Sequence, residues 1–422
     1  MVIRNIKEAE DVLARYVPAV SRLQANYNLD RMQQVMRLLG DPQEKLQVFH
    51  VAGTSGKTST CYYLASLVLI GGKKVGMTVS PHVDKVSERV QINGQPLADD
   101  KFCMYLAEFI DIVEKFDISL SYFELIMAFA YWVFAEKEHV DVAVIETGCG
   151  GLLDGTNVIS NPNKICAITD IGLDHVQLLG NTISAISSQK AGIVHPKNKV
   201  FMYGQSDEID TIFTKKSNEV NASLNFYDQD TLSLEHVELD NQLPLFQKRN
   251  WLLAAKVYTE SATIFGLSFL SAEQFVETFD TYIPARMDYS VLKGVQVIMD
   301  GAHNEQKMDA FVDSFISKYP GQKVPVVLAL KHDKDHSAVL ATLRPIVSKL
   351  IVTKFENHQD IPTFAENVPS LAEKAKKAGY DDIVIKPKPK DALNYAISLG
   401  PDRAVVTGSF YLISQLRAEL AK

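Results

Sequence analysis

Near the N-terminus of this chain an apolar segment runs directly into a glycine-rich turn and a lysine, an order that calls for a strand, a tight loop and a helix in succession. Residues 48–59 read V-F-H-V-A-G-T-S-G-K-T-S. The backbone N–H groups of such a turn can surround a phosphate chain, and Lys57 adds a positive charge. Apolar residues then recur at helical spacing from Cys61 to Leu69, and Gly71 and Gly72 end the helix. The pattern predicts a phosphate-binding loop, and so a protein that binds a nucleoside triphosphate.

The loop has the short form G-T-S-G-K-T over residues 53–58, because Val51 occupies the position at which the general pattern has its first glycine. The sequence contains no guanine-reading N-K-x-D motif, and the nearest string, N-K-I-C at residues 163–166, lacks the aspartate. These two features disfavour a GTPase and leave ATP as the expected nucleotide.

Length and charge restrict the class of protein further. A chain of 422 residues is long enough for two domains, and 46% hydrophobic with 22% charged residues is typical of a soluble globular enzyme. A net charge of -8 offers no basic surface, so we expect no nucleic-acid partner. The most apolar run, residues 125–135, is too short to span a bilayer and predicts a buried helix.

Two features that would indicate secretion, a signal sequence and paired cysteines, are not found in the chain. The N-terminal residues contain no apolar signal core, and no C-x-x-C pair occurs among the four cysteines, Cys61, Cys103, Cys149 and Cys166, all of which lie in apolar sequence. We therefore expect reduced thiols in the core, a cytoplasmic location and no membrane partner.

Strands and helices alternate from residue 48 to about residue 285. The expected strands are residues 75–79, 140–145, 165–169 and 200–203, and the expected helices are residues 99–116, 123–136 and 182–191. Apolar strands separated by helices predict a parallel sheet covered on both faces. Residues 86–94 end in Asn93-Gly94 and predict a β-ribbon with a tight turn.

A second alternation begins near residue 291. Strands are expected at residues 295–299, 324–330, 350–353, 383–385 and 404–407, with a helical stripe over 308–316, helices at 337–347 and 392–398, and a terminal helix. This pattern predicts a Rossmann-like domain, although its G-x-G-x-x-G motif is missing and a dinucleotide site is unsupported. The expected fold is therefore α/β: a large P-loop ATPase-like parallel-sheet domain, residues 1–285, followed by a smaller Rossmann-like α/β domain, residues 286–422.

Four polar residues stand at or after the ends of the expected elements of the large domain, where ligands of open α/β sheets collect: Ser80, Glu146, His175 and Lys190. A hydroxyl, a carboxylate and an imidazole near a phosphate loop can hold Mg²⁺ against the phosphates. Taken singly, Ser80 is an ordinary turn residue, His175 a core histidine and Lys190 a solvated charge. Glu146 is different, because a carboxylate that closes a buried strand is costly unless it is paired or bound to metal.

Beyond these patterns, the chain resembles the folylpolyglutamate synthases, the folate branch of the Mur ligase superfamily of ATP-dependent amide-forming ligases. The resemblance covers nearly the whole chain in order. It rests on the phosphate loop together with S-P-H at residues 80–82, E-R-V at 88–90, E-T-G at 146–148, I-G-L-D-H at 171–175, K-A-G-I at 190–193, D-G-A-H-N at 300–304, D-K-D at 333–335 and G-S-F-Y at 408–411.

This resemblance implies roles for individual residues. The triphosphate would be held by Gly53, Thr54, Ser55, Gly56, Lys57, Thr58 and Ser59. Magnesium, as two ions, would be ligated by Ser80, Glu146, His175 and a Lys190 carbamylated by CO₂, and a monovalent cation is a further implied cofactor. Asn250, Arg286 and Asp300 would contact ATP, and His303 and Ser409 the incoming glutamate. Lys57, Lys190 and His303 would be the catalytic residues.

The chain also departs from that family. Its loop has Ser55 and Thr58 where the family usually reads T-N-G-K-G-S, which is nearer to the cell-wall ligases, and Leu152 stands where many members have arginine. Thr58 offers an extra hydroxyl to a metal, and Leu152 lies near the expected pterin pocket.

We expect an ATP-dependent ligase that adds L-glutamate to the γ-carboxylate of a folate through an acyl phosphate, releasing ADP and phosphate. Its partners would be small molecules, namely folate or dihydropteroate and L-glutamate, and the protein would be a monomer. Whether it also has dihydrofolate synthase activity is left open. One alternative is a Mur ligase that joins an amino acid to a different carboxylate, and another is a non-catalytic ATP-binding switch, which has no need of the metal-binding constellation.

Overall fold

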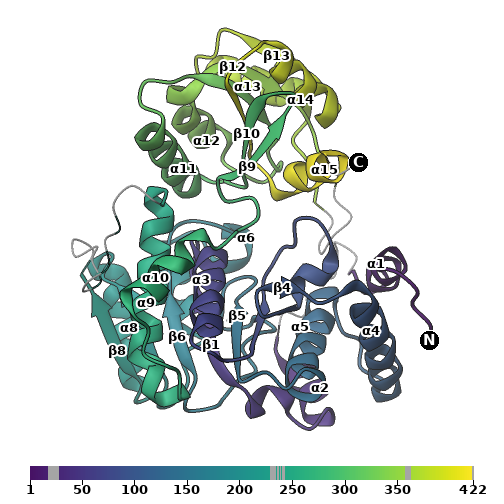
Figure 1. Cartoon of the computed structure of the whole chain (residues 1–422), viewed down its shortest axis with the longest axis vertical. Helices are drawn as coiled ribbons and strands as arrows, with labels where there is room; N and C mark the ends of the chain where they lie inside the picture. Colours follow the sequence, from purple (N-terminus) through teal and green to yellow (C-terminus); the bar gives the residue numbers. More distant parts are fainter. Residues whose placement is uncertain are drawn as a thin grey trace. The chain divides into compact units, whose positions relative to one another are not determined.

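The structure, a computed structural model of the chain, describes residues 1–17, 28–228, 243–356 and 363–420, with residues 234, 237 and 239. It divides into two compact units (Figure 1). The large unit comprises Met1–Gln242 and Gln247–Tyr282, and the small unit comprises Leu243–Phe246 and Ile283–Lys422. The small unit therefore takes up the chain again at Ile283, whereas the sequence places the boundary after residue 285.

The large unit is built on an eight-stranded sheet. Its strands are β1 (Gln47–Ala52), β2 (Val75–Thr78), β3 (Gln91–Ile92), β4 (Gln95–Pro96), β5 (Val142–Glu146), β6 (Ile165–Ile168), β7 (Lys199–Tyr203) and β8 (Ser223–Tyr227). They lie in the order β4-β3-β2-β5-β1-β6-β7-β8, and all pairs from β2 to β8 are parallel. Burial on both faces explains why β2, β5 and β6 consist of buried residues throughout.

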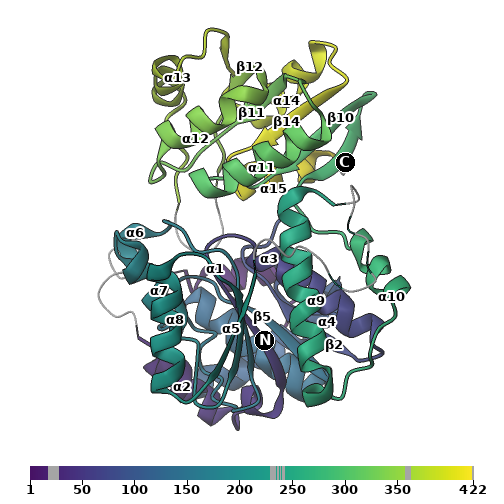
Figure 2. The same ribbon diagram turned by 90° about the vertical axis from the view of Figure 1, so that its left-hand side faces the viewer.

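Helices cover both faces of this sheet. They are α1 (Ile6–Ala14), α2 (Asp30–Leu38), α3 (Lys57–Ile70), α4 (Asp99–Val113), α5 (Tyr122–Trp132), α6 (Val176–Leu179), α7 (Ile183–Ala191), α8 (Asp207–Glu219), α9 (Leu245–Phe265) and α10 (Ala272–Glu277). Helices α4 and α5 pack on the face of Val48 and Ile145, and α7 and α8 on the same face further along. Phe49 points the other way and meets Phe265 of α9, and Figure 2 shows the sheet between α8 and α9.

The predicted ribbon over residues 86–94 is only partly correct. The turn at Asn93-Gly94 joins the short strands β3 and β4 as expected. Val86–Arg89, however, is a 3-10 helix and not a strand. The carboxylate of Glu88 accepts hydrogen bonds from the backbone N–H groups of Val83, Asp84 and Lys85, and these bonds hold the segment in a turn.

The small unit has a six-stranded sheet of order β13-β12-β11-β14-β10-β9. Its strands are β9 (Asp288–Leu292), β10 (Val295–Asp300), β11 (Val324–Leu328), β12 (Val347–Val352), β13 (Ile383–Ile385) and β14 (Arg403–Thr407), and only the edge strand β9 is antiparallel to its neighbour. Its helices are α11 (Glu305–Lys318), α12 (His336–Leu343), α13 (Val368–Lys377), α14 (Pro389–Ser398) and α15 (Phe410–Leu420).

One predicted helix of the small unit is too long. The expected helix over residues 337–347 ends at Leu343, a 3-10 turn covers Arg344–Ile346, and Val347 already belongs to β12. Pro345 explains this end, because proline has no N–H for a helical hydrogen bond. The fold class itself is confirmed: both units are α/β, with mostly parallel sheets.

Two further expectations concern burial. The helix predicted for the most apolar run is α5, and ten of its eleven residues are buried, with Phe123 half-buried. Among the described residues, no helix combines the length and the apolar character needed to cross a bilayer. All four cysteines are free thiols, but Cys149 is half-buried and so differs from the core position expected for it.

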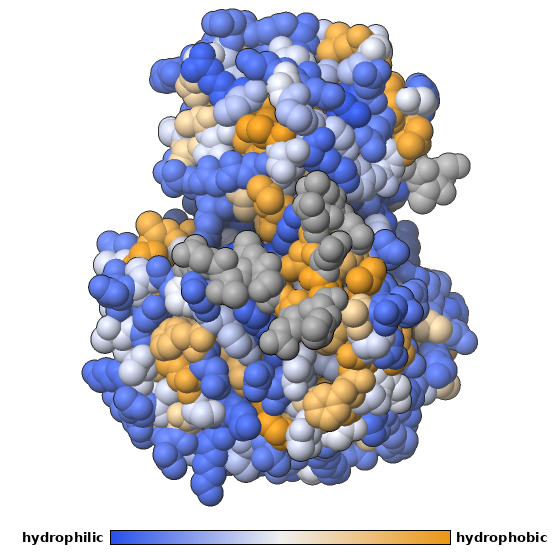
Figure 3. Space-filling view, turned by 60° about the vertical axis from the view of Figure 1, so that its left-hand side comes forward, coloured by the Kyte–Doolittle hydropathy of each residue, from blue (hydrophilic) through white to orange (hydrophobic). Residues whose placement is uncertain are grey.

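Figure 3 shows one face of the molecule, on which hydrophilic side chains predominate and the apolar ones form separate patches.

Candidate active site

The loop between β1 and α3 is packed so closely that a side chain at either of two glycines would displace a neighbouring residue. Gly53 has φ +150° and Gly56 has φ +92°, both in the region that side chains disfavour. A Cβ on Gly53 would lie 1.8 Å from the Oγ1 atom of Thr169, and one on Gly56 would lie 2.3 Å from the Oδ1 atom of Asn250. The first N–H groups of α3 lack acceptors within the helix, so this loop forms a cradle suited to phosphate.

Two lysines place positive charge at this loop. The Nζ atom of Lys57 donates to the carbonyl oxygens of Gly53 (3.1 Å) and Thr54 (3.4 Å). The Nζ atom of Lys190, from α7, donates to the same Gly53 oxygen at 2.7 Å. Lys190 is only 4% exposed, so the interpretation of Lys190 as a solvated charge is wrong. An acidic chain has thus concentrated two cations where a phosphate chain needs them.

Glu146 is the carboxylate of this site. It ends β5, is 3% exposed, and accepts hydrogen bonds from the Oγ1 atom of Thr58 (2.9 Å) and the backbone N–H of Ser80 (3.2 Å). Carboxylate and hydroxyl oxygens are hard ligands, and Mg²⁺ is usually held by one or two carboxylates, phosphate oxygens and water. The residues present therefore fit a magnesium ion.

His175, another predicted metal ligand, lies on the surface of the protein. His175 is the N-cap residue of the short helix α6, and its side chain is exposed, so it is not a core histidine. Within residues 1–17, 28–228, 243–356 and 363–420, no three His, Cys, Asp or Glu side chains gather closely enough to hold a metal ion. A metal at this edge of the sheet would therefore depend on hydroxyl, phosphate and water oxygens as well as on Glu146.

The loop that contains Leu152 lies against the helix of Lys190. The N–H of Leu152 donates to the carbonyl oxygen of Gln189 at 2.6 Å, and a Cβ on Gly192 would lie 2.5 Å from Leu152. The Nδ2 atom of Asn157 donates to the carbonyl oxygens of both Leu152 and Gly192, each at 3.1 Å. The Leu152 side chain is nevertheless exposed and available to a ligand.

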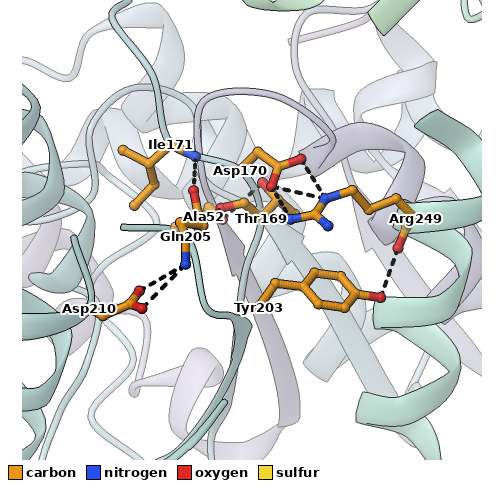
Figure 4. Close-up of polar contacts among 8 residues, drawn as sticks. All are labelled: Ala52, Thr169, Asp170, Ile171, Tyr203, Gln205, Asp210 and Arg249. Atoms are coloured by element: carbon orange, nitrogen blue, oxygen red, sulfur yellow. Dashed lines mark hydrogen bonds and ion pairs between the residues drawn. The ribbon is translucent and has the colours of Figure 1, made fainter. Parts of the chain in front are cut away.

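A pair of residues that sequence reasoning missed supports the phosphate loop from the next strand. Asp170 follows β6, and its carbonyl oxygen accepts the N–H groups of Thr54 (2.7 Å) and Ser55 (3.1 Å). The Asp170 carboxylate is bound by the guanidinium of Arg249 in α9, as Figure 4 shows. The sequence does indicate that each residue lies near the site, since Asp170 stands at the carboxyl end of a strand and Arg249 precedes Asn250. Neither position in the sequence implies that the two residues pair.

In the small unit, Asp300 ends β10 and lies opposite Thr407 of β14, so the polar residues of both strands meet at one edge. The Asp300 carboxylate accepts the N–H groups of Met287 and Ala302, each at 2.9 Å. Burial raises the pKa of Asp300 to about 6, although the charge of Arg286 and these two N–H donors lower it. The Arg286 guanidinium lies 4.5 Å from the centroid of the Phe410 ring.

The expected glutamate contacts lie at the same edge of this sheet. The Nδ1 atom of His303 is 2.8 Å from the Gly301 carbonyl oxygen, which leaves Nε2 facing the Nζ atom of Lys307 at 3.1 Å. Ser409 follows β14, is buried, and accepts the N–H of Tyr411 at 3.2 Å. The structure thus groups the predicted residues in two sets: Lys57, Thr58, Ser80, Glu146, Lys190 and Asn250 in the large unit, and Arg286, Asp300, His303 and Ser409 in the small unit.

Comparison with known families agrees with this division. Residues 51–250 match the Mur ligase middle domain, and residues 285–410 match the Mur ligase glutamate ligase domain.

Individual relatives are similar over most of their length. The dihydrofolate synthase/folylpolyglutamate synthase of Bacillus subtilis is 27% identical, covering 93% of this chain and 94% of the relative. The protein of the same name from Escherichia coli is 30% identical over 82% of this chain and 83% of its own length. Among solved structures, Mycobacterium tuberculosis folylpolyglutamate synthase complexed with ADP and AMPPCP has a TM-score of 0.83 at 27% identity, covering 99% of this chain and 98% of that one. The bifunctional enzyme of Yersinia pestis, complexed with AMPPNP and a Mn ion, has a TM-score of 0.82 at 25% identity over 99% and 98% of the two chains. By domains, sequence and fold, this chain belongs to the folylpolyglutamate synthase/dihydrofolate synthase family of the Mur ligases.

Proposed function

We propose that this protein is an ATP-dependent ligase that adds L-glutamate to the γ-carboxylate of a folate, with release of ADP and phosphate. The observation that carries the proposal is the loop at residues 53–58, where Lys57 and the buried Lys190 share the Gly53 carbonyl oxygen and Thr58 donates to Glu146. A phosphate cradle, the cation of Lys57 and a carboxylate suited to metal are the parts that activation of a carboxylate by ATP requires. Their occurrence in a chain similar along its length to folylpolyglutamate synthases supports the folate acceptor.

The chemistry follows from the substrates. A carboxylate does not react with an amine at neutral pH, so an oxygen of the folate γ-carboxylate first attacks the γ-phosphorus of ATP, and ADP leaves. The amine of glutamate then attacks the acyl carbon of the acyl phosphate, loses a proton and displaces phosphate, which leaves an amide. Lys57 and the N–H groups at the start of α3 neutralise charge on the transferred group.

Magnesium would be held by Glu146 with Thr58 and Ser80, where it would neutralise negative charge on the β- and γ-phosphates. We propose a second Mg²⁺, held by His175 and by Lys190 as a carbamate, together with a monovalent cation. Addition of CO₂ converts the Lys190 ammonium, which would repel a cation, into an anionic oxygen ligand. The 4% exposure of Lys190 supports this reading, because burial protects a carbamate from water.

The remaining contacts are assigned by position. Asn250 would contact the adenine, since its side chain lies against Gly56 of the loop. Arg286 and Asp300 would complete the nucleotide contacts, and His303 and Ser409 would hold the glutamate. His303 would contact this substrate through Nε2, which lies 3.1 Å from the Lys307 Nζ atom, since Nδ1 is engaged with the Gly301 carbonyl oxygen. We further propose that the protein acts as a monomer in the cytoplasm.

The acceptor is tested by mass spectrometry of the products. Purified protein is incubated with ATP, Mg²⁺ and L-glutamate, and tetrahydrofolate, dihydropteroate and a panel of unrelated carboxylates are offered separately. A mass increase of one glutamate on tetrahydrofolate establishes the proposed activity. The same increase on dihydropteroate would add dihydrofolate synthase activity, a name that several relatives carry. Product with only an unrelated carboxylate would refute the folate assignment, and no product with any acceptor would favour a non-catalytic switch.

A further inference from the structure

Asp170 holds the first half of the phosphate loop through its backbone. Its carbonyl oxygen accepts the N–H groups of both Thr54 (2.7 Å) and Ser55 (3.1 Å). Two residues further on, the Oγ1 atom of Thr54 donates to the carbonyl oxygen of Gly172 (3.0 Å) and also lies 3.1 Å from the Gly172 N–H. The start of the loop is therefore bonded to the segment after β6, in addition to its bonds with Lys57 of its own helix.

The side chain of Asp170 is attached to a second element, helix α9. The Nε atom of Arg249 lies 3.1 and 3.0 Å from the two carboxylate oxygens of Asp170, and Nη2 lies 2.7 Å from Oδ1. The Arg249 guanidinium also lies 4.2 Å from the centroid of the Tyr203 ring. Figure 4 shows the two side chains facing each other. A fork-shaped ion pair stacked on an aromatic ring has one orientation, which a flexible lysine could not reproduce.

This ion pair joins both ends of the phosphate loop. Arg249 is followed by Asn250, whose Oδ1 atom occupies the space beside Gly56 at the end of the loop. Asp170 is therefore bonded to the start of the loop through its carbonyl oxygen, and through Arg249 to the helix that contacts the end. Burial disfavours the charged form of Arg249. The hydrogen bond and the negative charge of Asp170 outweigh this effect, so that the pKa of Arg249 is raised.

Gln205 holds the segment of Asp170 from the opposite side. Its Oε1 atom accepts the N–H of Ile171 at 2.8 Å, and its Nε2 atom donates to the carbonyl oxygen of Thr169 at 3.4 Å. The backbone N–H of Gln205 in turn donates to the Asp210 carboxylate, at 3.1 and 3.3 Å. The segment is thus hydrogen-bonded on both sides, by Gln205 and by Arg249 of α9.

We propose that Asp170 and Arg249 are a positioning pair for ATP, which sets the distance between the phosphate loop and the Asn250 side chain. The pair touches the loop and the helix and is assigned no contact with ATP itself. This inference rests on the proposed function for its ligand. It predicts that loss of the pair weakens ATP binding far more than binding of glutamate.

The test compares the wild type with Asp170→Asn, Arg249→Gln, the double variant and Arg249→Lys. Affinity for a non-hydrolysable ATP analogue is measured by calorimetric titration with Mg²⁺, alongside kcat and the KM values for ATP and glutamate. We expect each single variant to bind the analogue about tenfold more weakly, or ~1.4 kcal/mol, with KM for glutamate changed less than twofold. The double variant should bind the analogue as tightly as the weaker-binding of the two single variants, because both changes remove the same interaction. Arg249→Lys should not restore affinity.

A matched control is the Lys74–Glu138 ion pair, at 2.9 Å, which lies before the amino ends of β2 and β5 and so at the opposite edge of the sheet. Lys74→Gln should leave affinity for the analogue unchanged, and thermal unfolding of every variant separates loss of fold from loss of binding. If Arg249→Gln does not fold, Asp170→Asn decides, since it keeps the shape of the side chain and the carbonyl oxygen that binds the loop.

The inference is overturned if the single variants bind the analogue as the wild type does, if their effects add in the double variant, or if Lys74→Gln has the same effect. A wild type that does not bind the analogue would refute the proposed function itself, and the inference with it. Unchanged variants of a wild type that binds would overturn the inference alone.

Discussion

Replacement of Gly56 by alanine should separate the stability of the phosphate loop from its affinity for ATP. Two effects are expected at this position. The backbone has φ +92°, and a side chain there is strained by roughly 1–3 kcal/mol. The new Cβ would also lie 2.3 Å from the Oδ1 atom of Asn250, so that this side chain must turn away. Because the displaced atom is the end of a side chain, the protein should still fold.

Gly56→Ala should weaken ATP binding as well as lower stability. We propose that Asn250 donates a hydrogen bond to the adenine. Loss of this bond would leave a polar group without its partner and should weaken binding by about 1–3 kcal/mol. This energy corresponds to roughly 5- to 150-fold in affinity. Gly94→Ala is the matched control, because Gly94 also has positive φ (+73°) but nothing lies within 4 Å of its added Cβ. Gly94→Ala should therefore lose stability without losing affinity.

The assay measures the free energy of unfolding in urea and the Kd of an ATP analogue for both variants. In an Asn250→Ala background, Gly56→Ala should reduce affinity much less than in the wild type, because the displaced contact is already absent. The reasoning is refuted if Gly56→Ala and Gly94→Ala bind the analogue equally well, or if the Gly56 effect is undiminished in the Asn250→Ala background.

Four further changes test the site. Lys57→Ala should lower turnover by roughly 100-fold or more while shifting the free energy of unfolding by less than about 0.5 kcal/mol; wild-type turnover in the folded variant would contradict the phosphate-loop assignment. Lys190→Ala should lose most activity and regain part of it in formate or acetate, whereas Lys190→Arg should not respond; full activity of Lys190→Ala without added carboxylate would make this lysine purely structural. Leu152→Arg should change KM for the folate and leave KM for ATP nearly unaltered, because its exposed side chain is expected near the pterin, and equal effects on both substrates would place the loop elsewhere. For Asp300, burial raises the pKa from 3.8 to about 6, so the folded state holds the proton more tightly than the unfolded state and the resulting stability is lost as the pH rises through 6. Relative to Asp300→Asn, the wild type should lose up to ~3 kcal/mol of unfolding free energy between pH 4 and 7, and parallel pH curves for the two proteins would disprove this.

The phosphate loop, its strand and its helix could be predicted from the sequence because their signals are local. Continuous apolar residues, glycines at two turn positions and helical spacing each act over a few neighbouring residues. The polar residues at the strand ends were recognised for the same reason, since the carboxyl edge of a parallel sheet collects them whatever the exact strand order. Glu146 is the best example: a carboxylate that closes an apolar strand indicates a site before any fold is known.

What only the tertiary structure decided is which of these residues meet. Lys190 reads as a solvated charge in sequence, yet it is buried because α7 brings it to the Gly53 carbonyl oxygen, 137 positions away in the chain. Asp170 and Arg249 are separated by 79 positions, and no local pattern links them. Burial and pairing depend on how helices pack across the sheet, and a chain of alternating strands and helices permits several strand orders with the same local pattern. The kind of site is therefore written in short segments of the sequence, whereas the contacts that position it arise from packing.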